Sequence, residues 1–230
     1  MKKEKDNKSE KLKQIIEKYS IDLDKLKAEQ EKLAKQLSIK DSIDFSNIAK
    51  IGAIETGFFE NKIITGIVVM LEDEIIEEKY QQDKLRFPYI PGFRAYRELP
   101  AMLECFNKLE EKPELILVNG HGISHERLGL ASHFSLSTNV PTIGVAESLI
   151  FGEVKNGEII VKGKKVGKVI HLKEGSNPLY VSPGNLISID TAAEIVRKLI
   201  QPGHKLPEPM RKAKKYVDEV RKELFGSGLG

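Results

Sequence analysis

The sequence predicts an α/β fold, in which helices flank a mixed β-sheet on both faces. Three observations lead to this class. Three strand-like segments with turn-like pairs between them come first. A continuous apolar run at 115–118 then has the character of a central, buried strand. Beyond it, strand-like and helix-like segments alternate to the end of the chain.

The first 20 residues are predicted to form a charged N-terminal extension. Residues 1–10 are mostly Lys, Glu, Asp and Ser, a composition that favours disorder. Apolar residues at helical spacing then predict one helix over 12–19 and a second over 23–37, both packed on the body of the domain. We expect one domain over residues 21–225 and a flexible tail at 226–230.

An antiparallel meander is expected next, with strands over 51–58, 62–71 and 74–80. Glu60-Asn61 and Glu72-Asp73 provide the two turns. After a proline-rich loop, a helix is predicted to run to about Leu109. The remaining elements are expected at 115–118 (strand), 128–136 (helix), 142–145 (strand), 157–170 (hairpin), 179–181 (strand), 188–200 (helix) and 207–224 (helix). In this topology the first strand and the strand at 115–118 can lie side by side, and the carboxyl ends of such strands usually carry the functional site.

The composition is that of an ordinary globular protein, with 40% apolar and 31% charged residues and a net charge of +3. The single cysteine, Cys105, excludes an intrachain disulfide and lies in a segment typical of a buried helix face. No apolar run approaches the roughly 20 residues that span a bilayer. The charged first ten residues, with no apolar segment after them, do not have the pattern of a signal peptide. We therefore expect a cytoplasmic protein, most simply a monomer, that does not contact a membrane.

The segment 87–98 is the most informative part of the chain. Pro88 and Pro91 fix φ on either side of Tyr89 and Ile90, and Gly92 follows. A stiff loop that displays an aromatic and an apolar side chain is suited to insertion between stacked bases. An ordinary proline-rich surface turn is the alternative.

Three polar residues are expected at the functional edge of the sheet. Glu55 interrupts an apolar strand, Glu98 follows the proline loop, and Asn119 ends the buried strand. Converging carboxylates are unfavourable unless they bind a cation or a partner. Two carboxylates with a substrate phosphate are sufficient ligands for Mg²⁺, which can then promote phosphodiester hydrolysis.

Over about residues 23–220 the sequence resembles the endonuclease V family. The matching blocks lie at 87–98, 118–125, 129–133, 141–145, 180–184 and 206–211, in the order of the family. The resemblance implies an RNase H-like fold and Mg²⁺- or Mn²⁺-dependent cleavage of DNA or RNA, one nucleotide 3′ of a deaminated adenine (inosine). It implies Glu55, Glu98 and Asn119 as metal ligands. It also implies a wedge that separates the strands, formed by the loop of Pro88, Tyr89, Ile90, Pro91 and Gly92. A pocket for the flipped base is implied at Gly120, Gly122, Ser182 and Gly184, and His125 is implied as a phosphate contact.

The chain departs from the family at four catalytic positions. Glu55 stands where the family has an aspartate, which keeps the charge on a longer side chain. Asn119 stands where the family has an aspartate, Glu147 where it has a lysine, and Lys214 where it has a histidine or aspartate. In one interpretation catalysis is weakened or lost, and a nucleic-acid-binding protein with an intact wedge remains. In the other, Glu147 and Lys214 exchange charges and restore the site, which requires both side chains to face Glu55. A third interpretation, from a different class, is a structural or assembly factor that uses the fold as a scaffold.

Overall fold

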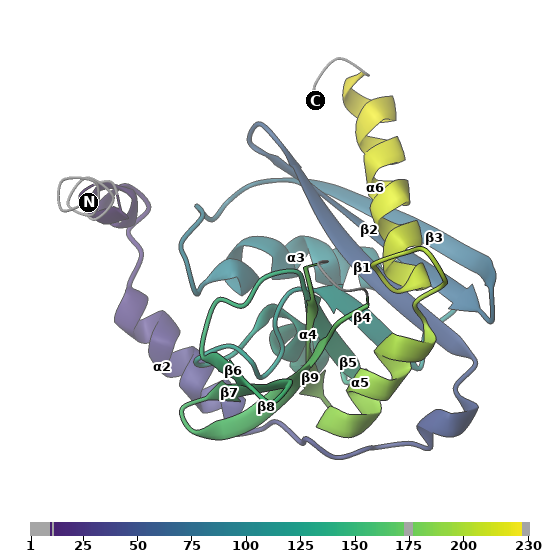
Figure 1. The fold of residues 1–230 in the computed structure, drawn as a ribbon. Helices are drawn as coiled ribbons and strands as arrows, with labels where there is room; N and C mark the ends of the chain where they lie inside the picture. The colour runs from purple at the N-terminus through teal and green to yellow at the C-terminus, as the bar shows by residue number, and fades with distance from the viewer. Residues whose placement is uncertain (1–9, 11, 173–176, 227–230) are drawn as a thin grey trace.

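A single nine-stranded mixed sheet organises the chain (Figure 1). The computed structural model describes residues 10, 12–172 and 177–226. The predicted disorder of the first ten residues and the predicted flexible tail fall almost wholly outside this range. Residues 12–18 are helical. The elements that follow are α2 (Leu23–Ala34), η1 (Phe45–Asn47), β1 (Lys50–Phe59), β2 (Lys62–Leu71), β3 (Glu74–Lys84), α3 (Arg94–Asn107), β4 (Leu115–Asn119), α4 (Leu130–Thr138), β5 (Thr142–Ala146), β6 (Glu153–Lys155), β7 (Glu158–Val161), β8 (Lys164–Ile170), β9 (Leu179–Asn185), α5 (Ile189–Lys198) and α6 (Glu208–Phe225).

The strands lie in the order β3-β2-β1-β4-β5-β9-β8-β7-β6. The predicted meander is confirmed, because β1 pairs with β2, and β2 with β3, in antiparallel register. The predicted neighbourhood of the first strand and the strand at 115–118 is also confirmed. These strands, β1 and β4, are parallel, and the register ends with Ile54 opposite Val118. The next residue of each strand, Glu55 or Asn119, therefore lies at the carboxyl edge of this pair.

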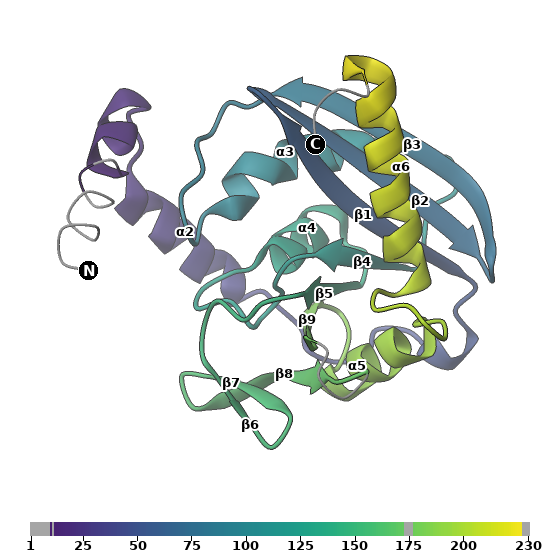
Figure 2. The same ribbon diagram turned by 45° about the horizontal axis from the view of Figure 1, so that its top comes forward.

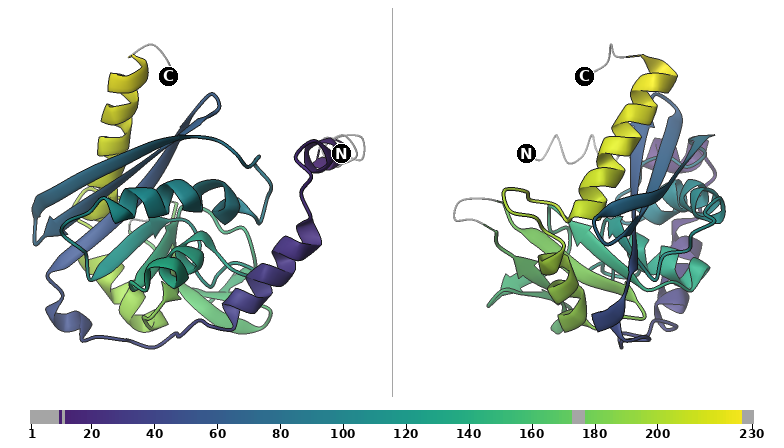
Figure 3. Two further views of the ribbon diagram at one scale, coloured as in Figure 1. Left: turned by 180° about the vertical axis from the view of Figure 1, so that it is seen from behind. Right: turned by 90° about the vertical axis from the view of Figure 1, so that its right-hand side faces the viewer.

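Helices cover both faces of the sheet. Figure 2 shows α6 lying across β1 and β2, with α3 behind the same strands. From behind, α3 and α4 are in front of the sheet, whereas α6 lies on the far side (Figure 3, left). Helix α5 packs against β8 and β9. This arrangement confirms the predicted α/β class.

Strand β4 shows why the fold needs both helical layers. Leu115 and Leu117 join a buried cluster that includes residues of α5 and α6, whereas Ile116 and Val118 join a second cluster with residues of α3 and α4. Successive side chains of a strand point to opposite faces, so a continuous apolar run is buried on both. The sequence interpretation of residues 115–118 is therefore correct.

The local signals in the sequence mostly act as expected. Ser188 caps α5 by accepting a hydrogen bond from the Thr191 amide. Glu72 adopts a φ of 53° in the turn between β2 and β3. The largest differences from the predicted strands are in β3, which extends to Lys84, and in β9, which extends to Asn185. The three-residue strand β6 was not foreseen. All three residues of β6 are exposed, so no apolar pattern marks it.

Within the part of the chain that the structure describes, no helix has the length and apolar character needed to cross a membrane.

Candidate nucleic-acid interface

Two carboxylates and one amide meet at the carboxyl edge of β1 and β4. Glu55 comes from β1, Asn119 ends β4, and Glu98 lies one turn into α3, which packs on β1 and β2. Glu98 is 2% exposed. The structure thus brings together the three residues to which the sequence assigned a metal.

Each carboxylate already accepts hydrogen bonds from the protein. The amide nitrogen Nδ2 of Asn119 lies 2.9 Å from Oε1 and 3.0 Å from Oε2 of Glu55. The Thr56 hydroxyl donates to Oε2 of Glu98 over 2.7 Å, and the Arg94 Nε donates to Oε1 of Glu98 over 2.5 Å. All four carboxylate oxygens are therefore engaged by donors of this chain.

Burial is the strongest influence on the charge of Glu55, and it raises the pKa of this carboxyl above its usual value. The Asn119 amide and the positive charges of Arg94 and Lys214 act in the opposite direction. Burial also acts on Arg94, but the adjacent Glu98 outweighs it and raises the pKa of the guanidinium. Arg94 is therefore charged at every physiological pH.

This donor set does not fit a magnesium site. A metal ligand must turn a lone pair towards the ion, whereas Asn119 turns its amide N–H groups towards Glu55. Asn119 would have to rotate to turn its Oδ1 towards an ion, and the positive charge of Arg94 beside Glu98 opposes a second cation there. Among the described residues, no three or more His, Cys, Asp or Glu side chains are grouped so that they could hold a metal ion.

The exchange of charge between Glu147 and Lys214 requires both side chains to face Glu55, and of the two only Lys214 acts on this carboxylate. Glu147 forms an ion pair with Lys205 at 3.0 Å, and its side chain is 54% exposed. No hydrogen bond or ion pair joins it to Glu55 among the described residues. Lys214 is exposed on α6, and its charge does act on Glu55. The geometry therefore does not bring Glu147 to the carboxylates in place of the missing aspartate.

The proline loop presents a single side chain to solvent. Tyr89 is 63% exposed, whereas Ile90 is only 2% exposed. The expectation that both residues are displayed is wrong for Ile90, because its side chain is buried and anchors the loop. The Phe93 amide closes a turn on the Ile90 carbonyl at 3.0 Å. Gly92 has a φ of 82°, in the left-handed region that favours glycine.

A buried glutamine from outside the sheet fastens this loop. Gln30 of α2 is 1% exposed, and its Nε2 donates to the carbonyls of Gly92 (3.1 Å) and Leu128 (3.4 Å). Its Oε1 accepts from Nε of Arg127 at 2.8 Å. The guanidinium of Arg127 also lies 5.1 Å from the centre of the Phe93 ring. The predicted packing of this helix on the domain is thus confirmed for α2.

The small residues assigned to the base pocket lie in tightly packed backbone. A Cβ on Gly122 would come within 1.9 Å of the Pro183 carbonyl oxygen, and one on Gly184 within 1.9 Å of the Thr142 hydroxyl. Ser182 is fully buried and accepts from the Gly122 amide at 3.0 Å. These contacts give Gly122, Ser182 and Gly184 a role inside the protein. Gly120 differs, since its nearest neighbour is Nη1 of Arg94, 3.2 Å from the site of a Cβ.

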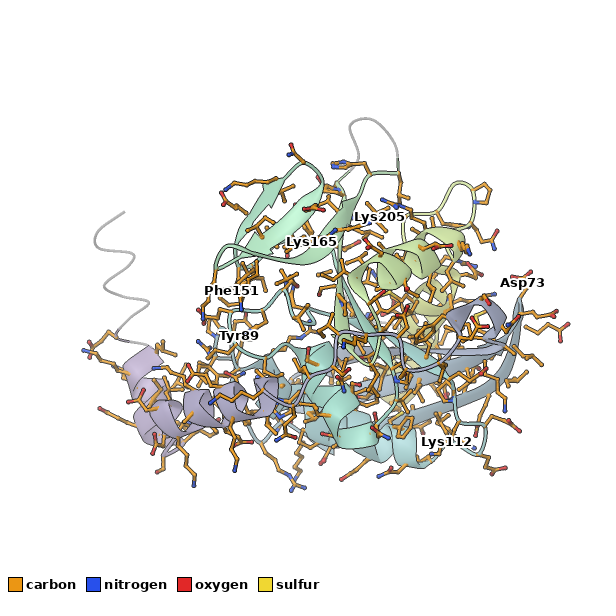
Figure 4. The ribbon with its side chains drawn as sticks, turned by 90° about the horizontal axis from the view of Figure 1, so that it is seen from below. Asp73, Tyr89, Lys112, Phe151, Lys165 and Lys205 are labelled. Carbon is orange, nitrogen blue, oxygen red and sulfur yellow. The ribbon has the colours of Figure 1, made fainter. Side chains whose placement is uncertain are left out.

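His125 lies between the proline loop and the segment after β5. Its Nε2 is 3.8 Å from the position of a Cβ on Gly92, and its ring packs edge-on against Phe151 with the centroids 4.6 Å apart. Figure 4 shows Tyr89 and Phe151 on the same side of the molecule. Burial, with the charge of Arg127, lowers the pKa of His125 to about 3. At neutral pH it can contact a phosphate by a hydrogen bond but not by charge.

Sequence reasoning missed four residues of this region: Gln30, Arg94, Arg127 and Phe151. Arg94 carried a usable signal, because it stands four residues before Glu98 at the start of a helix, where opposite charges meet. Gln30 carried none, since a polar residue in an amphipathic helix is normally exposed. Its burial depends on the distant carbonyls of Gly92 and Leu128.

Comparison with known proteins identifies relatives of both sequence and fold. A family model described as Endonuclease V matches residues 31–215. The Endonuclease V of Bacillus subtilis is 27% identical, with 85% of this chain and 90% of that chain covered and a TM-score of 0.77. The catalytic domain of human Endonuclease V is 26% identical, with 89% and 98% covered and a TM-score of 0.79. The Ciona intestinalis enzyme, in complex with a 24mer DNA containing an inosine followed by a ribo-adenosine, is 25% identical, with 88% and 98% covered and a TM-score of 0.79. The RNase H-like fold expected from the sequence is thereby confirmed.

Proposed function

The chain belongs to the Endonuclease V family, and we propose that it binds inosine-containing DNA or RNA through the loop at Tyr89, with strand cleavage weakened or lost. The family assignment supplies the class of ligand, since the Ciona relative is bound to inosine-containing DNA. The residues of this chain decide between binding and cleavage.

The observation that carries the proposal is the exposure of Tyr89 on a loop that is otherwise held fast. Ile90 is buried beneath it, and the Gly92 carbonyl is bonded to Gln30. A rigid loop with one projecting aromatic ring can stack on a base or separate two bases without first being ordered. The ring is the wedge of this proposal, and the flanking Pro88 and Pro91 limit its motion.

Hydrolysis on the 3′ side of inosine is the second candidate function, because Glu55 and Glu98 are both present. Members of the family are typically Mg²⁺-dependent. When bound, such an ion polarises the phosphodiester and activates water. Here the carboxylate oxygens accept hydrogen bonds from Asn119, Thr56 and Arg94, and this argues against cleavage.

Fluorescence anisotropy with labelled oligonucleotides tests the binding proposal. Inosine-containing DNA and RNA are compared with the same sequences that carry adenine, each at two salt concentrations. We expect tighter binding to inosine, and a loss of about tenfold in affinity on Tyr89→Ala, since stacking on one base contributes about 1–3 kcal/mol. Tyr19→Ala is the matched control, because Tyr19 is 46% exposed and lies outside the residues that the family model matches.

The same oligonucleotides, incubated with Mg²⁺ or Mn²⁺ and resolved on a denaturing gel, test the second candidate. Cleavage that Glu98→Ala abolishes would favour the enzyme over the binding protein. Binding without cleavage supports the proposal. Neither binding nor cleavage would reject both, and would favour the interpretation of the fold as an assembly scaffold.

A further inference from the structure

Arg94 holds a central position among the carboxylates. As the first residue of α3, it projects along the helix to Glu98 one turn later, with Nε 2.5 Å from Oε1. Its Nη1 faces Gly120, the residue directly after Asn119. Its charge also acts on Glu55. One guanidinium thus influences both carboxylates and adjoins the end of β4.

Asn119 and Thr56 donate the remaining hydrogen bonds to these carboxylates. Asn119 supplies one N–H donor group to both oxygens of Glu55, and Thr56 supplies a hydroxyl to Glu98. Without a cation, the buried carboxylate of Glu98 and the half-buried carboxylate of Glu55 would repel each other and be poorly solvated. The arrangement avoids this with a permanent positive charge, because an arginine does not lose its proton in proteins.

Arg94 and Glu98 are also difficult to separate. The Glu98 side chain is 3% exposed, so removal of its partner would leave a buried charge uncompensated. A divalent ion that entered here would have to displace the guanidinium against this pairing. It would also meet the amide of Asn119, a neutral ligand, in place of a third carboxylate.

We propose that Arg94 takes the place of a divalent metal ion in this chain, so that a side chain of the protein offsets the charge of Glu98 and the site binds nucleic acid without metal. The Arg94 side chain is 37% exposed, so part of it is accessible to a ligand although Nε is bonded to Glu98. A guanidinium pairs well with phosphate, because several donors lie in one plane. The ligand class is therefore a nucleic-acid phosphodiester, and this second part of the inference rests on the proposed function.

A Mn²⁺ titration without nucleic acid tests, independently of the proposed function, whether Arg94 takes the place of a metal ion. Free Mn²⁺ is followed by electron paramagnetic resonance with the wild-type protein, Glu98→Gln, and the double variant Arg94→Leu/Asn119→Asp. We expect no binding by the wild type at concentrations up to about 1 mM, and a gain in affinity of at least about tenfold in the double variant. Wild-type binding that Glu98→Gln abolishes would overturn the proposal. A folded double variant that fails to gain affinity would overturn it as well.

Nucleic-acid binding by the wild-type protein provides a readout that needs no variant to fold. We expect the affinity for inosine-containing DNA and RNA to be equal in EDTA and in Mg²⁺ at matched ionic strength. An affinity that rises at least about tenfold with Mg²⁺ would contradict the replacement of the metal by Arg94. If nucleic acid does not bind in either buffer, the proposed function fails, whereas the Mn²⁺ titration still decides the role of Arg94.

Discussion

Replacement of Gln30 by methionine should loosen the loop that carries Tyr89. Methionine preserves the length and most of the volume of the side chain, so the change removes hydrogen bonds but little packing. Three are lost: those to the Gly92 and Leu128 carbonyls, and the one accepted from Arg127. At about 1 kcal/mol each, with a further cost for polar groups left without partners, we expect a loss of about 2–4 kcal/mol in the free energy of unfolding.

Urea denaturation at neutral pH measures this change, with Gln36→Met as the control because Gln36 is exposed. The affinity for inosine-containing DNA should fall together with the stability, because the loop is no longer held in place. A double-mutant cycle with Arg127→Met should give a coupling energy of about 1 kcal/mol or more. If Gln30→Met and the control differ by less than about 0.5 kcal/mol, the hydrogen bonds of Gln30 do not fasten the loop.

Three further outcomes follow from the packing of the site. Ile90→Ala should destabilise the protein by about 2–4 kcal/mol, whereas Tyr89→Ala should change stability by less than about 0.5 kcal/mol, as measured by urea denaturation. Gly122→Ala should lower stability by about 3 kcal/mol or more, because the new Cβ would lie 1.9 Å from the Pro183 carbonyl oxygen; a normal melting temperature would contradict this. Burial lowers the pKa of His133 to about 4, from about 6.5 in the unfolded chain. Between these values the unfolded state binds the extra proton, so stability falls as the pH drops. His133 alone should contribute about 2 kcal/mol to the loss between pH 7 and pH 5. Burial also lowers the pKa of His121 to about 4 and that of His125 to about 3, so the total loss is larger, and His133→Phe should reduce it by about 2 kcal/mol.

The sequence contained enough to predict most strands of the sheet and the meander, because periodicity is a local property. The run at 115–118 identified a strand buried on both faces, and the turn residues at 60–61 and 72–73 separated the meander correctly. β6 was missed because its pairing with β7 leaves all three residues exposed.

The direction of individual side chains could not be predicted in the same way. Ile90 and Tyr89 are adjacent in a loop, where no period assigns one to the core and the other to solvent. Glu147 follows the expected strand, yet the nearby Lys205 holds it in an ion pair. The sequence identified Asn119 as a weak metal ligand but not as a hydrogen-bond donor to Glu55. That role depends on the parallel register of β1 and β4, which brings the two residues side by side.

The position of Gln30 has a consequence for where this chain can be shortened. The family model begins at residue 31, one residue after Gln30, whose side chain holds the loop of Tyr89 by a hydrogen bond to the Gly92 carbonyl. A truncated protein that starts at this boundary would keep the whole sheet with Glu55 and Glu98, and would lack the hydrogen bonds of Gln30 that hold the loop of Tyr89. The start of the family match is therefore not the start of the structure that holds the loop of Tyr89. That structure begins earlier, in α2.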